Sequence, residues 1–209
     1  MNLDLKSVQG KLSQSWHSMP DTTKKISSVI IPIFELDDLG QGLILTQRAK
    51  HLNSHPGQIS FPGGVLDPED KDLLQCALRE WEEEMGVSRE QLTVLGKHEG
   101  MQTRTGFHIT PFLGKYIGDF QFSHNEDEVE KIIILPFSKL LKAPFYSLQF
   151  TSRNGDDHSF YFDLEDGLLW GATCEMIIRL LNDYASFDRK PIQVQPNLNS
   201  PPFFDPKLI

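Results

Sequence analysis

The hydrophobic pattern of the chain changes between a helical and an extended period, which predicts a fold of mixed helices and strands. Apolar residues recur at helical spacing from Leu5 to Trp16, so we expect a short amphipathic helix near the start. A β-branched run over residues 24–36 is followed by the turn sequence DDLGQG and by the apolar segment 42–48. The two segments therefore predict a buried β-hairpin.

The rest of the chain predicts further strands and two more helices. Residues 49–72 form a long connection rich in Gly, Pro, His and Asp, and loops of that length are usually functional. We expect a helix from about Asp72 to Met85, with Gly86 as its C-terminal cap. A final amphipathic helix is expected over residues 171–185. Strands are expected within residues 92–100, 107–117, 128–137, 146–152 and 158–164.

Helices at the start, middle and end of a strand-rich chain indicate an α/β (α+β) class with helices layered on a mixed sheet. We divide the chain into an N-terminal helical extension (residues 1–25), a main domain (26–186) and a Pro-rich C-terminal tail (187–209). Phe203 and Phe204 give the tail an apolar end. A homodimer held by this tail as an intersubunit arm is one hypothesis.

The composition narrows the classes of binding partner and the cellular location that we expect. The chain has 209 residues, with 20 Lys and Arg against 29 Asp and Glu, which gives a net charge of −9. This balance argues against a nucleic-acid-binding protein. No run of apolar residues is long enough to span a membrane, and the N-terminus lacks the pattern of a secretory signal. Cys76 and Cys174 form no CxxC motif, so we expect a reduced, cytoplasmic protein.

The helix expected at 72–85 carries an unusual group of carboxylates. Glu80 and Glu84 are four residues apart and Glu83 is three residues from Glu80, so all three project from neighbouring positions. Like charges at this spacing destabilise a helix, and negative charge near its C-terminus opposes the helix dipole. A hard divalent cation would relieve the repulsion. The alternative is a solvated acidic face without a function.

The residues around this helix resemble the Nudix box. Phe61-Pro62-Gly63-Gly64 is followed by a loop and then by R-E-W-E-E-E-M-G-V. The matching positions are Arg79, Glu80, Trp81, Glu83, Glu84, Gly86 and Val87. The acidic residue usually found midway between the glycine and the arginine is Asp70 here, with a spacing one residue longer. The resemblance implies a Nudix fold: an α/β/α sandwich with a mixed sheet and a loop-helix catalytic motif.

A second motif is similar to the element of coenzyme A pyrophosphatases within the Nudix superfamily. Residues 43–64 read LILTQRAKHLNSHPGQISFPGG, which fits the subfamily pattern Leu-Thr-x-Arg followed by His-x-Gly and Phe-Pro-Gly-Gly. This resemblance makes Arg48, His55 and Gln58 candidate substrate-binding residues, since an arginine binds phosphate groups with two donors. Asn53 occupies a position that usually carries Arg, which removes one possible phosphate contact.

The resemblance also implies roles in catalysis. The implied ligands of Mg²⁺ or Mn²⁺ are Glu80, Glu84, Glu83 and the carbonyl of Gly64. Arg79 would orient the glutamates. The base that activates water varies among Nudix enzymes, so Glu83, Glu128 and His124 are all candidates.

The resulting hypothesis is an enzyme that hydrolyses the diphosphate bond of coenzyme A or its derivatives. The products would be 3′,5′-ADP and 4′-phosphopantetheine or its acyl form. One alternative is a Nudix hydrolase of another nucleoside diphosphate derivative such as ADP-ribose, NADH or a dinucleoside polyphosphate. Another is a non-catalytic Nudix-fold module that binds a nucleotide. The expected partner is a small-molecule nucleotide, with neither nucleic acid nor membrane involved.

Overall fold

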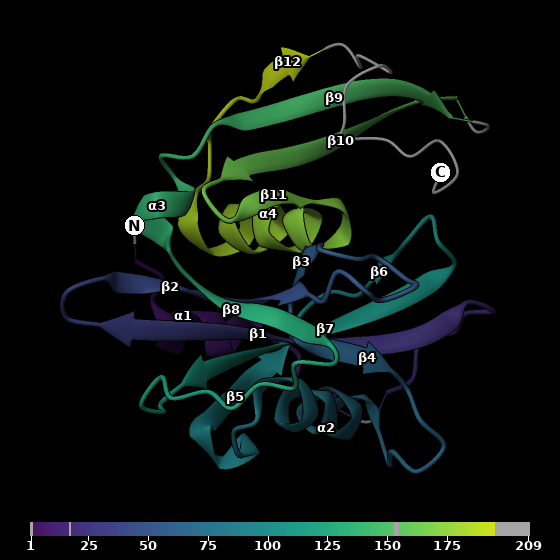
Figure 1. The fold of residues 1–209 in the computed structure, drawn as a ribbon, viewed down its shortest axis with the longest axis vertical. Helices are drawn as coiled ribbons and strands as arrows, with labels where there is room; N and C mark the ends of the chain where they lie inside the picture. The colour runs from purple at the N-terminus through teal and green to yellow at the C-terminus, as the bar shows by residue number, and fades with distance from the viewer. Residues whose placement is uncertain (1, 17, 153–154, 195–209) are drawn as a thin grey trace.

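The computed structural model describes residues 2–16, 18–152 and 155–194 (Figure 1). Its helices are α1 (Leu5–Lys11), α2 (Leu73–Met85), α3 (Phe137–Leu140) and α4 (Gly171–Ala185), with a 3-10 turn at Arg89–Gln91. Its strands are β1 (Lys25–Leu36), β2 (Gly40–Arg48), β3 (Ile59–Ser60), β4 (Gly63–Val65), β5 (Leu92–Lys97), β6 (Met101–Gln102), β7 (Phe107–Tyr116), β8 (Val129–Pro136), β9 (Phe145–Ser152), β10 (Gly155–Leu164), β11 (Gly167–Trp170) and β12 (Ile192–Val194). Within the described chain, no helix is long and apolar enough to cross a lipid bilayer.

The strands form two sheets. The larger sheet follows the order β3-β2-β1-β7-β5, with β4 beside β1, β6 beside β7 and β8 beside β2. β1 and β7 run parallel, whereas β1 pairs antiparallel with β2 and β4. The smaller sheet has the order β11-β10-β9-β12. Helix α2 covers one face of the larger sheet, and α4 lies between the two sheets (Figure 1). The predicted α/β/α arrangement is confirmed, and the smaller sheet adds a fourth layer.

The central strand β1 supplies side chains to two separate cores. Ile30 and Phe34 belong to the core on the α2 side, where they pack with Trp81. Ile31 and Ile33 belong to the core on the α4 side. Successive side chains of a strand point to opposite faces of the sheet, so a strand covered by helices on both faces must be apolar throughout. This explains the continuous apolar run that the sequence shows at this position.

Three expectations about secondary structure are corrected. Helix α1 ends at Lys11 rather than continuing to Trp16, because the chain there leaves the helix to pair with β5. The connection over 49–72 is not wholly irregular, since it contains β3 and β4. The C-terminal tail contains a short strand, β12, which pairs in parallel with β9. The apolar end of the tail, with Phe203 and Phe204, lies outside the described residues.

Residues 2–16, which we call the N-terminal strap, pass around the β5 edge of the larger sheet. Three of its apolar side chains are buried on the α4 side of the sheet: Leu3, Val8 and Leu12. Ser13 and Lys97 then exchange two backbone hydrogen bonds, at 3.1 and 2.9 Å. Beyond them, Trp16 stacks on Phe112 on the α2 side, with ring centroids 6.3 Å apart. The strap therefore covers an edge that would otherwise expose unpaired backbone groups.

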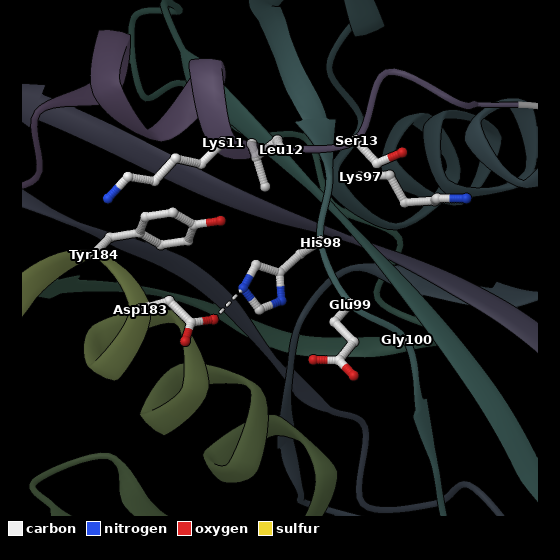
Figure 2. Close-up of a pocket in the computed structure, with 9 residues that line it drawn as sticks. All are labelled: Lys11, Leu12, Ser13, Lys97, His98, Glu99, Gly100, Asp183 and Tyr184. Atoms are coloured by element: carbon white, nitrogen blue, oxygen red, sulfur yellow. Dashed lines mark hydrogen bonds and ion pairs between the residues drawn. The ribbon is translucent and has the colours of Figure 1, made fainter.

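A cavity of about 370 Å³ is lined by residues 11–13 of the strap, by residues 97–100 and by the end of α4 (Figure 2). The imidazole of His98 is buried, and its Nε2 lies 2.9 Å from Oδ2 of Asp183. Lys11 lies over the ring of Tyr184, with 5.8 Å between its Nζ and the ring centroid. These contacts hold the strap and α4 at the same end of β5.

We expect the substitution Gly96→Ala to destabilise the protein by about 2 kcal/mol, because a Cβ at this position meets atoms that it cannot displace freely. That Cβ would lie 2.5 Å from Cβ of Leu12 and 2.9 Å from Nε2 of Gln14, so the strap would have to move. Denaturant unfolding and limited proteolysis of the strap would measure the effect. Gly10→Ala is the matched control, since a Cβ there meets nothing within 4 Å. Equal stability of the two variants would contradict the proposed role of Gly96.

Candidate active site

Helix α2 presents an apolar face to the sheet and an acidic face to the turn between β3 and β4. Asp72 caps its first turn, where Oδ1 accepts from the N–H of Gln75 at 2.8 Å, and Gly86 ends it with a left-handed φ of 65°. The buried side chains of the helix that face the core are Leu73, Cys76, Ala77, Trp81 and Met85. Leu74, the next residue after Leu73, is only partly buried.

Glu84 is a carboxyl group in the protein interior, with 3% of its surface exposed. Burial, reinforced by the nearby charge of Glu80, raises the pKa of Glu84 to about 8. Arg48 and the N–H of Gly63, which donates to Oε2 at 3.3 Å, oppose this rise. Burial also raises the pKa of Glu80, although Arg79 opposes the effect. The ionised forms of these two adjacent carboxyl groups are disfavoured, and a bound cation would stabilise them.

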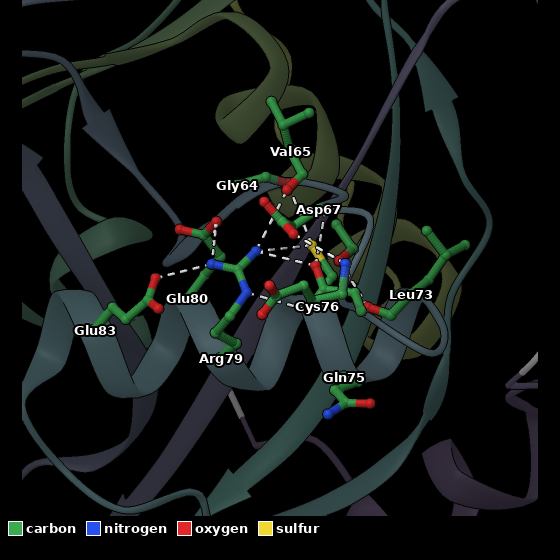
Figure 3. Close-up of polar contacts among 12 residues, drawn as sticks. Gly64, Val65, Asp67, Leu73, Gln75, Cys76, Arg79, Glu80 and Glu83 are labelled. Atoms are coloured by element: carbon green, nitrogen blue, oxygen red, sulfur yellow. Dashed lines mark hydrogen bonds and ion pairs between the residues drawn. The ribbon is translucent and has the colours of Figure 1, made fainter.

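The backbone of Gly63 and Gly64, at the start of β4, lies against this acidic face. Strand β4 pairs with β1 so that Gly64 lies opposite Ser28. A Cβ on Gly64 would lie 2.2 Å from Oε1 of Glu80, so the position accepts only glycine without displacing that carboxylate. The thiol of Cys76 donates to the carbonyl oxygen of Gly64 at 3.7 Å (Figure 3). The backbone of Gly64 and the carboxylate of Glu80 are therefore in contact.

Arg79 connects the loop before the helix to two of the glutamates (Figure 3). Its Nε and Nη2 donate to the two carboxylate oxygens of Asp70 at 3.1 and 3.0 Å. Its Nη1 lies 2.9 Å from Oε1 of Glu80 and 2.8 Å from Oε2 of Glu83. The side chain of Asp70 is only 2% exposed, and the guanidinium lowers the pKa of Asp70. Arg79 is thus fixed by Asp70 and in turn orients Glu80 and Glu83.

The loop that precedes β8 brings Glu128 to the same acidic face. The N–H of Asn125 in this loop donates to the carbonyl oxygen of Glu84 at 3.1 Å, which fixes the loop to the end of α2. The charge of Glu128 raises the pKa of both Glu80 and Glu84, so its carboxylate lies within electrostatic range of both. His124 belongs to the same loop and is partly buried.

Arg48 and His55 lie in and beside the 49–58 loop, which joins β2 to β3. The N–H of Gly57 donates to the carbonyl of Arg48 at 3.1 Å, and the N–H of Arg48 donates to the carbonyl of Gln58 at 2.9 Å. These two bonds close the base of the loop. His55 has a left-handed φ of 55°, and its buried Nδ1 has no hydrogen-bond partner among the described residues. Such backbone strain is frequent at ligand-binding loops.

Most of the predicted site residues come together in the structure. One group gathers at the acidic face of α2: Glu80, Glu83, Glu84, Gly64, Arg79 and Glu128. Arg48 lies within electrostatic range of Glu84. His55 and Gln58 instead contact one another within the 49–58 loop, through a backbone bond of 3.3 Å.

The donor set fits a hard divalent cation, which prefers oxygen ligands. Glu84 is buried, and among the described residues one backbone N–H donates to its carboxyl group, while the charge of Arg48 acts from farther away. In the part of the chain that is described, no three acidic, His or Cys side chains converge on one point as a finished cage. Glu80 and Glu83 each place one carboxylate oxygen against Nη1 of Arg79.

Two residues that were not predicted, Cys76 and Ser28, hold the elements of the site in place through hydrogen bonds. The thiol of Cys76 bonds the carbonyl of Gly64, and burial raises the pKa of this thiol to about 11, so it remains a donor at neutral pH. The hydroxyl of Ser28 donates to the carbonyl of Leu73 at 2.7 Å and joins β1 to the first turn of α2. For Cys76, the sequence offered one signal, since it precedes Arg79 by three residues on the same helical face. The contact of Ser28 depends on tertiary packing alone.

We expect Gly64→Ala to reduce the activity that the sequence resemblance implies by about 100-fold with little change in stability, because the new Cβ displaces the flexible end of Glu80 rather than backbone. Steady-state kinetics and a metal titration followed by thermal unfolding would measure both quantities. An unchanged rate would show that contact between residue 64 and Glu80 is irrelevant to activity. Gly10→Ala again provides a control with free space around the added carbon.

Comparison with known proteins agrees with this geometry. The sequence profile of the NUDIX domain matches residues 24–157. A relative described as an uncharacterized Nudix hydrolase NudL, from Yersinia pestis (strain Pestoides F), is 35% identical over 159 residues, which cover 76% of this chain and 79% of the relative. The NudL of Yersinia pseudotuberculosis serotype O:1b (strain IP 31758) matches to the same extent. The chain therefore belongs to the Nudix hydrolase family, and it is an enzyme of the class that acts on pyrophosphate bonds.

Solved structures support the fold. The Nudix hydrolase RenU from M. smegmatis superposes with a TM-score of 0.52 at 13% identity and covers 85% of this chain and all of its own. A MutT/nudix family protein from Enterococcus faecalis superposes with a TM-score of 0.50 at 15% identity, over 80% of this chain and 64% of that protein. At such identities the likeness concerns the fold alone. Nudix hydrolases generally use divalent cations, which agrees with the donor set described above.

Proposed function

We propose that this enzyme hydrolyses the diphosphate bond of coenzyme A or its derivatives, with Mg²⁺ or Mn²⁺ as cofactor. The products are 3′,5′-ADP and 4′-phosphopantetheine or its acyl form. One observation carries the proposal: the 49–58 loop, whose sequence resembles the coenzyme A element, adjoins the acidic site, with Arg48 close enough to lower the pKa of Glu84. A guanidinium beside the hydrolytic carboxylates is suited to a diphosphate or to the 3′-phosphate of the nucleotide.

The chain supplies the ligands and the charge that this reaction requires. Glu80, Glu84, Glu83 and the Gly64 carbonyl would hold the cation, which acts as a Lewis acid on phosphoryl oxygens and acidifies bound water. Arg79 orients Glu80 and Glu83. Arg48, with His55 and Gln58 on its loop, binds the phosphate groups of the substrate.

A carboxylate must accept the proton of the attacking water. As the water oxygen bonds to phosphorus, the anhydride P–O bond breaks and the second phosphate leaves with the electron pair. Glu128 and Glu83 are the two candidate bases at the acidic face, with His124 as a third on the loop of Glu128. Glu83 is the more exposed of the two carboxylates, and its Oε2 accepts from Nη1 of Arg79 at 2.8 Å. This bond fixes the orientation of the Glu83 carboxylate at the acidic face.

The test is a substrate panel. The purified protein would be incubated with coenzyme A, ADP-ribose, NADH and diadenosine polyphosphates, each with Mg²⁺ or Mn²⁺, and the products would be identified by mass spectrometry. We expect 3′,5′-ADP from coenzyme A at the highest kcat/KM. Faster turnover of another compound, without 3′,5′-ADP from coenzyme A, would exclude the proposed substrate.

One observation favours a second candidate substrate. Asn53, which is exposed, replaces an arginine of the coenzyme A element, so one phosphate contact of that subfamily is missing. A different nucleoside diphosphate derivative, such as ADP-ribose, NADH or a dinucleoside polyphosphate, is therefore the alternative. Nucleotide binding without turnover would instead indicate the non-catalytic module.

The cytoplasmic location, the homodimer and the division at residues 25 and 187 remain predictions.

A further inference from the structure

Gln47 and Arg48 are neighbours on β2 whose side chains point to opposite faces of the larger sheet. Arg48 faces the α2 side, where its charge acts on Glu84. Leu43 and Leu45, which alternate with it along β2, belong to the core on the α4 side. Gln47 continues this second row, because side chains two residues apart share a face. The amide of Gln47 is therefore directed toward the smaller sheet, behind the 49–58 loop.

The amide of Gln47 bridges two segments that are distant in sequence. Its Nε2 donates to the carbonyl oxygen of Gly57 at 3.1 Å and to that of Asp166 at 3.5 Å. A primary amide has two N–H donors, so both bonds can form together. Gly57 lies in the 49–58 loop, whereas Asp166 lies in the turn between β10 and β11. One side chain thus joins the loop to the smaller sheet.

A second contact holds the same turn. Lys131 on β8 is the cross-strand partner of Gln47, and its Nζ lies 2.6 Å from Oδ1 of Asp166. Gly167 follows with a left-handed φ of 124°, and a Cβ there would lie 3.8 Å from Nε2 of Gln47. The edge strand β11 also contacts β3, the strand that follows the loop (Figure 1). The smaller sheet therefore supports the 49–58 loop from the face opposite to the glutamates.

We propose that Gln47 is a positioning residue for substrate binding, which clamps the 49–58 loop to the β10–β11 turn and so holds Arg48 and His55 in place. This inference rests on the proposed function, because it assigns the loop to the phosphate groups of the substrate. It also gives the smaller sheet a role: its β10–β11 turn provides the fixed point of the clamp. Because the amide of Gln47 bonds the loop and the β10–β11 turn rather than the glutamates, its loss should weaken binding more than the chemical step.

The variant Gln47→Leu tests the clamp, because leucine has a similar size and no donor. We expect KM for coenzyme A with Mg²⁺ to rise about threefold to tenfold, as the loss of one or two hydrogen bonds predicts, while kcat changes by less than about twofold. Hydrogen exchange of the backbone amides of residues 49–58 should become faster in the free enzyme. Lys131→Met, which removes the second contact to the turn, should change both quantities in the same direction. Gln9→Leu, at an exposed position of α1, is the matched control and should change neither.

Each outcome decides one of the two proposals. Unchanged exchange of residues 49–58 in Gln47→Leu would overturn the clamp. Faster exchange with an unchanged KM would overturn its role in substrate binding, and so would a loss confined to kcat. If the wild-type enzyme turned over another compound of the panel, KM would be measured with that compound. If it turned over none, the proposed function would fail, while faster exchange in Gln47→Leu would still support the clamp.

Discussion

Replacing Glu84 by Gln is expected to lower kcat/KM by about 1,000-fold. Glu84 is the most deeply buried of the proposed cation ligands, and in the described part of the chain a single backbone N–H donates to its carboxylate. A Lewis acid contributes several kcal/mol to the transition state of phosphoryl transfer, and each 1.4 kcal/mol corresponds to a tenfold change in rate. Steady-state kinetics over a range of Mg²⁺ and Mn²⁺ concentrations would measure the loss.

The same substitution should change how stability depends on pH. The pKa of Glu84 is raised from 4.5 to about 8, so the folded protein without metal retains a proton that the unfolded chain releases. The contribution of protonated Glu84 to the free energy of unfolding is therefore fully present below about pH 4.5. It is lost as the pH rises toward and through 8. Glutamine resembles the protonated carboxyl group and does not titrate. The melting temperature of the wild type without metal should fall more steeply between pH 6 and pH 9 than that of Glu84→Gln.

Added metal should reverse this difference in the pH dependence of the melting temperature between the wild type and Glu84→Gln. Saturating Mg²⁺ is expected to raise the melting temperature of the wild type more at pH 9 than at pH 6, because fewer protons must be displaced, and to affect Glu84→Gln less at both. Glu90→Gln, an exposed position just after α2, is the matched control. A Glu84→Gln enzyme with wild-type activity would exclude the proposed metal site.

Replacing Arg79 by Met is expected to reduce both stability and activity. The carboxylate of Asp70 is 2% exposed and would lose its bidentate partner, and breaking such a buried pair costs about 3 kcal/mol. Glu80 and Glu83 would also lose the donor that orients them, and removal of a residue in this supporting position typically costs about 10- to 100-fold in activity. Urea unfolding and kinetics on the folded variant would separate the two effects.

A surface arginine provides the comparison for Arg79. Arg179 on α4 pairs with Glu175 at 3.3 Å, and both side chains are 38% exposed. Arg179→Met should therefore cost less than about 1 kcal/mol and leave activity unchanged. If Arg79→Met were as stable as Arg179→Met, the Asp70–Arg79 pair would not fasten the loop to α2. The double variant with Asp70→Asn would then show no coupling.

Local patterns were sufficient to predict α2 and its acidic face. The cap at Asp72, the left-handed end at Gly86 and the four-residue spacing of Glu80 and Glu84 all act within one helix. Their consequences follow from helix geometry and need no information about the rest of the chain. The buried strand β1 likewise follows from its own continuous apolar run. The early end of α1 did not, because pairing of Ser13 with Lys97 replaces the next helical turn.

The environment of the acidic face depended on tertiary structure. The spacing of Glu84 and Glu80 predicts that they are neighbours, but not that Glu84 would be 3% exposed with a pKa of about 8. That value results first from burial and then from the charge of Glu80, and Glu128, which the fold brings to the end of α2, adds to it. Burial and charge act through space, so residues distant in sequence determine them.

The sequence by itself determined the class of this protein and the identity of its glutamates, because the Nudix box is a short contiguous motif on one loop and one helix. Only the tertiary structure decided what surrounds and supports that motif. Gln47 and Asp166 are 119 residues apart along the chain, and no local pattern relates them. Their contact exists because the edges of two sheets meet, and such a meeting is fixed by the packing of whole layers rather than by the preferences of any one segment.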